Sequence, residues 1–270
     1  MDETIIRKGA AAALAVIAIL QMSPIIEGSF THEAVGAVFF LLALMHLGMN
    51  SWWFKKSFTG VFHGRRAFLT VIDLLLLADV IGLAVSSPFV SMYLFNFLDL
   101  DGALFGRRLH LLTGTWAIIL MGAHFGAHLT YIRESLADRE IIVPNWITAA
   151  LWGASAVLGA ASFYDLKLID YLTLDELFVF FDDAKPPILF YAEYAAVFLG
   201  CAALSDAAGL ILAKLAPKPV KDAPVDESRN AMAKSFCVVL AIAVIALFSE
   251  LVIPEDLFGA QGESSEQSAP

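Results

Sequence analysis

The same histidine pattern occurs twice in this chain, each time inside a long apolar stretch. Both copies have the form His, three residues, Gly, nine residues, His, and they occupy residues 32–46 and 110–124. The first copy contains His32, Gly36 and His46, and the second contains His110, Gly114 and His124. An ionisable side chain is costly in an apolar segment and usually has a function there. The repeat therefore predicts two long helices that each carry two functional histidines.

Composition indicates a membrane protein. Of 270 residues, 59% are hydrophobic and only 16% are charged, whereas soluble domains carry about 25% charged residues. The net charge is -10, and no basic stripe with interleaved aromatic residues is present, so a nucleic-acid partner is not expected. Cys201 and Cys237 lie far apart in apolar segments, and the chain has no CxxCH motif. Covalent c-type haem attachment is therefore not supported.

Seven segments are candidate membrane spans, because a span needs about 20 mostly apolar residues. They are residues 5–23, 32–54, 67–88, 107–131, 144–163, 187–214 and 232–252. The first resembles an uncleaved signal anchor, since Arg7 and Lys8 precede an apolar run that lacks a small-x-small cleavage site. The predicted fold class is all-α, with about seven transmembrane helices.

The chain divides into three predicted parts. Residues 1–135 contain spans one to four, which are expected to form a four-helix bundle around the histidines. Residues 136–254 add three further spans and an amphipathic outer segment at 164–186, which is too charged to span. Residues 255–270 are expected to form a disordered acidic tail.

Basic residues predict the orientation, because cytoplasmic loops carry an excess of lysine and arginine. With seven spans, most of the 17 basic residues fall on the side of the N-terminus. We therefore expect a multi-pass protein of a bacterial cytoplasmic membrane, with the N-terminus in the cytoplasm and the C-terminus outside.

The histidine spacing favours haem ligation. Fourteen residues of α-helix make nearly four turns, so the two rings of each span share one face and lie roughly 21 Å apart. Both spans run from outside to inside and are parallel. His32 should therefore pair with His110 near the outer surface, and His46 with His124 near the inner one. Each pair can supply both axial ligands of a b haem, because imidazole suits iron.

Five neighbouring residues are further candidates for cofactor binding. Gly36 and Gly114 lie one turn after the outer histidines, where a macrocycle needs a helix without a side chain, although close helix packing is the alternative. Arg107 and Arg108 could pair with haem propionates or anchor the span at the interface. His128 lies one turn after an inner histidine and could be a substitute ligand, a propionate contact, part of a quinone site or a boundary residue.

Acidic residues within the spans are candidates for proton paths. Asp79 and Glu193 are the stronger candidates for protonation coupled to quinone chemistry. Asp73 and Asp206 lie near the predicted inner surface and are interpreted as boundary residues. Glu33 directly follows a histidine and is interpreted as a helix-start acid.

The doubled pattern resembles that of known membrane cytochromes. His-x13-His on two alternate helices is similar to cytochrome b of the respiratory bc complexes, but the PEWY-type quinone-site signature is missing. Residues 30–130 more closely resemble the small membrane cytochromes of the cytochrome b-561-like superfamily, especially the flavinylation-associated type. Their unit is a plain span followed by H-x3-G-x9-H-x3-N and a tryptophan. Here His46 is followed by Asn50, Trp52 and Trp53, whereas the second copy has His128 in place of the asparagine.

The resemblance implies membrane electron transfer. We therefore predict electron transfer across the membrane through two non-covalent b haems with two histidine ligands each. The expected partners are a quinone or quinol, an extracytoplasmic flavoprotein or cytochrome, and further membrane subunits. Catalysis would be quinone oxidation or reduction, by this chain or by a larger enzyme of which it is the cytochrome subunit.

Three alternatives remain open from the residues. The first is a proton or solute transporter without haem, which predicts a colourless protein. The second is a membrane protein that binds zinc, copper or iron directly, with His124 and His128 as half of the site. The third is a structural subunit that contains haem without turnover.

Overall fold

The computed structural model describes most of the chain up to residue 215. The described residues are 3–23, 28–57, 59, 64–130, 133, 144–179, 182, 184–215 and the isolated positions 235, 238, 239 and 242. Within this part the secondary structure is entirely helical. The helices are α1 (Glu3–Leu20), α3 (Ser29–Met49), α4 (Trp52–Ser57), α5 (Gly64–Val90), the 3-10 turn η1 (Asn96–Leu98), α6 (Ala103–Ala127), α8 (Asn145–Asp165), α9 (Leu168–Leu172) and α10 (Pro187–Leu215).

Five of these helices, α3, α5, α6, α8 and α10, are long and apolar enough to cross a membrane. They coincide with the second to sixth predicted spans and support a multi-pass membrane protein. The first predicted span forms the 18-residue helix α1, but it is not one of the five. Its first turns contain Glu3, Arg7 and Lys8, which shorten the apolar part. The predicted span at 232–252, apart from four isolated positions, and the tail at 255–270 lie outside the described residues.

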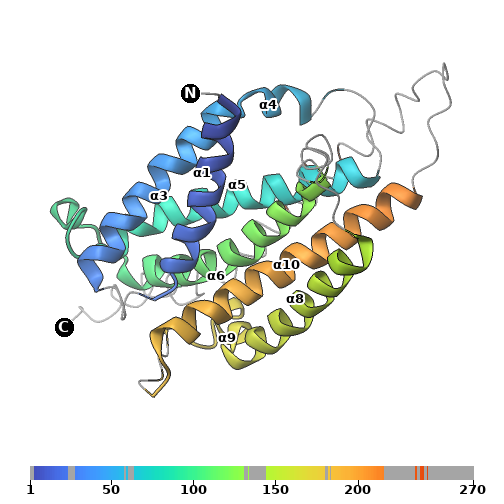
Figure 1. Ribbon diagram of the computed structural model, residues 1–270. Coiled ribbons are helices and arrows are strands. Elements are labelled where there is room, and N and C mark those ends of the chain that lie inside the picture. Colours follow the sequence, from blue (N-terminus) through green and yellow to red (C-terminus); the bar gives the residue numbers. More distant parts are fainter. Residues whose placement is uncertain are drawn as a thin grey trace, which may run out of the picture.

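The helices form two differently packed sides that share α6. On the first side, α5 packs along α6, and α1 packs against α3 (Figure 1). On the second side, α10 lies between α6 and α8 (Figure 1). The histidine side is defined here as α1, α3, α5 and the facing part of α6. The packed side is defined as α8, α10 and the opposite part of α6.

Glycines allow the helices of the packed side to approach closely. A Cβ atom added to Gly126 of α6 would overlap the backbone carbonyl of Ala202 in α10. A Cβ atom on Gly159 of α8 would lie 2.9 Å from the Cα atom of Gly200 in α10. Such small residues permit backbone contact between membrane helices, where van der Waals packing drives association.

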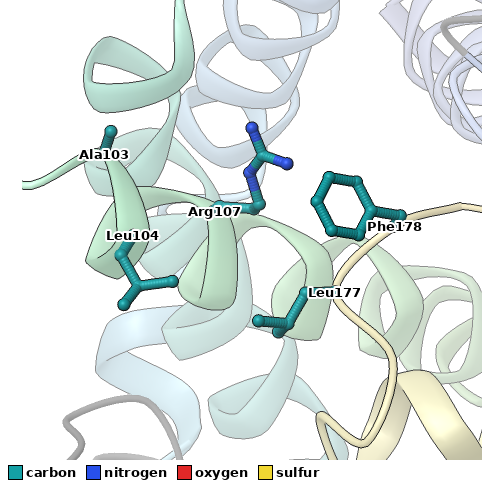
Figure 2. A pocket seen from close by; sticks show the side chains of 5 residues that line it. All are labelled: Ala103, Leu104, Arg107, Leu177 and Phe178. Carbon is teal, nitrogen blue, oxygen red and sulfur yellow. The ribbon is translucent and has the colours of Figure 1, made fainter.

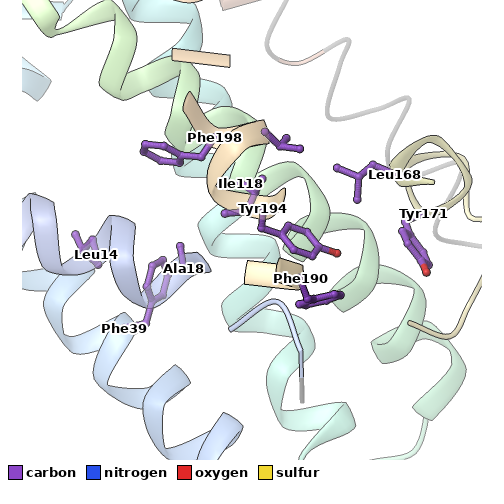
Figure 3. Packing of buried hydrophobic residues seen from close by; sticks show 10 residues of the cluster. Leu14, Ala18, Phe39, Ile118, Leu168, Tyr171, Phe190, Tyr194 and Phe198 are labelled. Carbon is purple, nitrogen blue, oxygen red and sulfur yellow. The ribbon is translucent and has the colours of Figure 1, made fainter. Parts of the chain in front are cut away.

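The largest buried cluster links α1, α3, α6, α9 and α10 (Figure 3). Part of it comes from the predicted amphipathic segment at 164–186, because Leu168 and Tyr171 of α9 are both buried. This segment therefore folds back onto the helices and closes one end of the packed side. The cluster consists of Leu14, Ala18, Phe39, Ile118, Leu168, Tyr171, Phe190, Tyr194, Val197 and Phe198.

Candidate functional site

The histidine side brings the two repeats together as parallel helices. We call the end with His32 and His110 the outer end, and the end with His46 and His124 the inner end, after the predicted orientation. The rings of His32 and His110 lie edge to face, with their centres 6.2 Å apart and their planes inclined by 69°. A metal–imidazole bond is about 2.0 Å long, so two rings on opposite sides of one metal ion have centres roughly 6 Å apart. The outer pair therefore has the spacing that two axial ligands require.

Ser86 of α5 determines which ring nitrogen of His110 is available to bind a metal. Its hydroxyl is fully buried and donates a hydrogen bond to the Leu83 carbonyl at 2.9 Å. The same oxygen lies 3.2 Å from Nδ1 of His110. Because the hydroxyl proton is already used, the oxygen accepts a hydrogen bond from the Nδ1–H group. The lone pair of neutral His110 then resides on Nε2, as in histidines that bind metals.

At the inner end, Asp73 of α5 determines which ring nitrogen of His124 is available to bind a metal. Its Oδ1 lies 2.8 Å from Nδ1 of His124, and its Oδ2 accepts a hydrogen bond from Nε1 of Trp53 at 2.7 Å. A carboxylate that accepts from Nδ1–H leaves Nε2 of His124 available for a metal. The sequence interpretation of Asp73 as a boundary residue is therefore incomplete, because its side chain directly contacts His124 of the repeat.

The fourth residue after each inner histidine marks the end of a helix. Asn50 follows α3, and its backbone N–H and side-chain amide both donate to the His46 carbonyl. His128 takes the equivalent place after α6, with its backbone N–H bonded to the His124 carbonyl. The His128 ring centre is 4.6 Å from that of His124, and its Nε2 is 3.8 Å from Oδ1 of Asp73. His128 therefore belongs to the inner cluster as well as to the helix end.

His46 is less closely paired than the outer histidines. It lies within electrostatic reach of His124, His128 and Asp73. Among the described residues, however, no close ring contact joins His46 to His124. The inner end is therefore a looser group of three histidines and one carboxylate, whereas the outer end is a compact pair.

The two glycines of the repeat do not mediate close helix packing. A Cβ atom on Gly114 would meet no described atom within 4 Å. One on Gly36 would meet only the side-chain amide of Gln21, at 2.9 Å. Both differ from Gly126, where backbone blocks a side chain. The space beside Gly114 is consistent with a flat group lying there.

Glu33 holds the outer end of α3 in place. Its carboxylate accepts hydrogen bonds from the backbone N–H groups of residues 92–94, which follow α5, at 2.6 Å for Met92 and 2.8 Å for Leu94. The Ser91 hydroxyl adds a bond of 2.7 Å. Glu33 therefore ties α3 to the end of α5, which also carries Ser86. The interpretation of Glu33 as only a helix-start acid is incomplete.

Arg107 is engaged with the segment that follows α9. Its guanidinium lies 4.7 Å from the ring centre of Phe178. Figure 2 shows the arginine and this ring beside a small pocket. The pocket is lined by Ala103, Leu104, Arg107, Leu177 and Phe178. Arg108, the next residue of α6, is half-buried. The predicted propionate contacts of both arginines stay predictions.

Two acidic residues of α10 form ion pairs. Asp206 is buried and binds the guanidinium of Arg133, and it also accepts a hydrogen bond of 2.9 Å from Nε1 of Trp152. Glu193 binds Nζ of Lys185 at 2.6 Å, and Lys185 also reaches Asp165 of α8 at 2.8 Å. These contacts join α8 and α10 at both of their ends.

Asp79 of α5 differs from these paired acids. It is buried, and its Oδ2 makes no hydrogen bond within the described part of the chain. Along α5 it lies between Asp73 and Ser86, hence between the two groups of histidines. Asp79 therefore remains the candidate for a proton-carrying carboxyl among the acids of the described spans.

The sequence interpretation did not predict that three residues would contact the histidines or their partners. Trp53, Asp73 and Ser86 all contact the repeat or its partners. One signal was present, because Asp73 and Ser86 are spaced along the third span almost as the histidines are along the fourth. Two antiparallel helices with equal spacing place such residues at matching depths.

Comparisons of the chain with protein-family models, with curated proteins and with solved structures found no match. A function for this chain must therefore be inferred from the geometry of the histidine side.

Proposed function

We propose that this protein is a transmembrane electron carrier that binds two b haems. His32 and His110 would hold one haem, and His46 and His124 the other. The observation that best supports this proposal is the outer pair, with ring centres 6.2 Å apart and Nδ1 of His110 occupied by Ser86. A b haem, when bound, supplies an iron that gains and loses single electrons.

The chain's own residues would prepare both sites. Ser86 and Asp73 orient the rings of His110 and His124 and direct Nε2 away from α5. Gly114 leaves space beside its helix for a flat group. A haem held by two histidines would be suited to electron transfer rather than to oxygen binding.

The proposal extends to the partners and the bundle. Electrons would be exchanged with a quinone or quinol at one membrane face, and with an extracytoplasmic flavoprotein or cytochrome at the other. We also propose that spans one to four form a four-helix bundle around the haems, as in cytochrome b-561-like proteins. The N-terminus would lie in the cytoplasm. The five candidate spans support passage across a membrane.

A reduced-minus-oxidised absorption spectrum with haem quantified per chain tests the proposal. We expect low-spin b-type bands at two haems per chain. His110→Ala should remove one haem and His124→Ala the other. His63→Ala is the control, since it removes an imidazole that lies outside both repeats and should retain both haems. Protein without haem, made with an adequate haem supply, would overturn the proposal and favour the transporter alternative.

A directly bound metal ion is the second candidate, and one observation favours it. Asp73, His124 and His128 offer ligand atoms that all lie within 4.8 Å of one another. The carboxylate thus completes the half-site that the sequence predicts from the two histidines. Metal analysis of the haem-free protein distinguishes the candidates. A stoichiometric zinc, copper or iron ion that is lost in both Asp73→Asn and His128→Ala would support this function.

A further inference from the structure

We infer that the two centres are unequal, and that Asp73 makes the inner centre harder to reduce than the outer one. The inference rests on the proposed function, since it concerns the potentials of iron bound at the two histidine pairs. Asp73 acts through His124 and is therefore a positioning residue with an electrostatic effect.

The two Nδ1–H groups have acceptors of different charge. At the outer end, His110 faces the neutral hydroxyl of Ser86 at 3.2 Å. At the inner end, His124 faces a carboxylate at 2.8 Å. Hydrogen bonds to an ionised acceptor are shorter and roughly twice as strong as neutral ones. The carboxylate therefore draws the Nδ1 proton more strongly and makes His124 the more basic ligand.

The surroundings of Asp73 indicate an ionised carboxylate. Trp53 can only donate through its indole N–H, so Oδ2 of Asp73 is an acceptor at 2.7 Å. Oδ1 faces the ring nitrogens of His124 and His128, at 2.8 and 3.8 Å. The side chain is only 10% exposed, so water screens its charge weakly. Both a basic ligand and a nearby negative charge stabilise oxidised iron relative to reduced iron.

The acceptor of Nδ1 of His110 at the outer end carries no charge. The hydroxyl of Ser86 is neutral, and its proton is committed to the Leu83 carbonyl. Glu33 lies next to His32 in the chain, but its carboxylate is bound by N–H groups of residues 92–94 and by Ser91. A single electron added to the protein should therefore reside mainly at the outer centre. This ordering favours electron flow from an inner donor, such as a quinol, toward an outer acceptor.

Redox titration of the haem-loaded protein, followed at the haem absorption bands, tests this inference. His110→Ala and His124→Ala, each with one remaining haem, assign the lower potential to the inner or the outer centre. In Asp73→Asn the lower potential should rise, with reduction of that centre favoured by about tenfold or more, which is 59 mV for one electron. The higher potential should change much less. Asp79→Asn is the matched control, because it makes the same change six residues away, at a carboxyl that is not hydrogen-bonded to a histidine in the described part of the chain.

A second variant acts in the opposite direction. Trp53→Phe removes the hydrogen bond to Oδ2, which leaves more negative charge on Oδ1 facing His124. The lower potential should then fall, with reduction disfavoured by about twofold. This variant keeps the inference testable if Asp73→Asn fails to bind the inner haem. The low-spin electron paramagnetic resonance signal of one haem should shift in both variants.

The outcomes separate the inference from the proposed function. Wild-type protein with no haem overturns the proposed function. Two haems whose lower potential belongs to the outer centre overturn the inference alone. The inference is also wrong if Asp73→Asn and Asp79→Asn raise both potentials equally, or if Trp53→Phe raises the lower potential.

Discussion

The packed side and the histidine side use glycine in opposite ways. Gly126 lies against the backbone of α10, whereas Gly114, twelve residues earlier on the same helix, borders open space. Helix α10 is buried along much of its length, but α3 buries only Phe39 among its described residues. A glycine in an apolar helix therefore does not by itself indicate packing, and the neighbouring helix decides its function.

The two sides are also held together differently. On the packed side, helix backbones approach closely at Gly126 of α6 and at Gly159 of α8, both against α10. On the histidine side α5 also packs closely on α6, but α3 is joined to α5 by polar contacts near its two ends, where Glu33 binds residues 91–94 and Trp53 binds Asp73. Arg65 of α5 adds a tie to Thr130 at 2.9 Å. Close glycine contacts therefore hold α10 in place, whereas polar contacts hold α3 in place.

The largest effect is expected at the buried polar anchor of the packed side. Asp206→Ala removes the partner of both Arg133 and Trp152 and should lower the free energy of unfolding by about 3 kcal/mol. Unfolding of the purified protein in mixed detergent micelles measures this loss. Asp206→Asn keeps the shape and one acceptor oxygen, so its loss should be smaller. Equal stability of Asp206→Ala and wild type would mean that this anchor does not stabilise the packed side.

A matched pair of glycine substitutions tests the comparison directly. Gly126→Ala should destabilise the protein by about 2 kcal/mol, because its Cβ atom would overlap the Ala202 carbonyl. In protein prepared without haem, Gly114→Ala should leave stability unchanged or raise it slightly, since alanine favours helix and the space is open. The same unfolding assay measures both. Similar losses in the two variants would contradict the contrast between the sides.

A pair of serine substitutions tests whether Ser86 orients the ring of His110 at the outer end. Ser86→Ala removes the acceptor for Nδ1 of His110 and should weaken haem binding at this end about tenfold. Ser87→Ala is the control, because Ser87 also donates to the Leu83 carbonyl, at 2.7 Å, but its hydroxyl has no bond to histidine. Haem retention during competition with apomyoglobin measures the change. Equal retention in both variants would count against a function for Ser86 in orienting the ring.

The smallest effect concerns the ion pairs at the start of α10. Burial lowers the pKa of Lys185, but hydrogen bonds and charges from Asp165 and Glu193 outweigh this and raise the pKa above its ordinary 10.5. The stabilisation is therefore complete below about pH 10.5 and is lost as the pH rises through the raised pKa. Thermal unfolding measured from about pH 9 to about pH 12 should show this small loss of stability. Lys185→Met should not show this loss of stability at high pH. If Lys185→Met and the wild type have the same pH profile, the ion pairs of Lys185 are not the source of the loss.

The sequence contained most of the fold of the described chain. Five of the seven predicted spans form long apolar helices, because apolar length is a local property. The first predicted span shows the limit of that rule, since Glu3, Arg7 and Lys8 belong to the same helix as the apolar run. The burial of Leu168 and Tyr171 was not evident from the charged segment 164–186, because their partners lie in distant helices.

For the site, the sequence by itself determined the histidines, their common helical face and their depth. These follow from residue spacing and the α-helical repeat. Only the tertiary structure decided that His32 and His110 lie 6.2 Å apart, that Ser86 and Asp73 bind the ring nitrogens, and that Gly114 faces open space. The physical reason is that periodicity fixes positions within one helix. The rotation of α5 and α6 about their axes depends on packing between segments far apart in the chain.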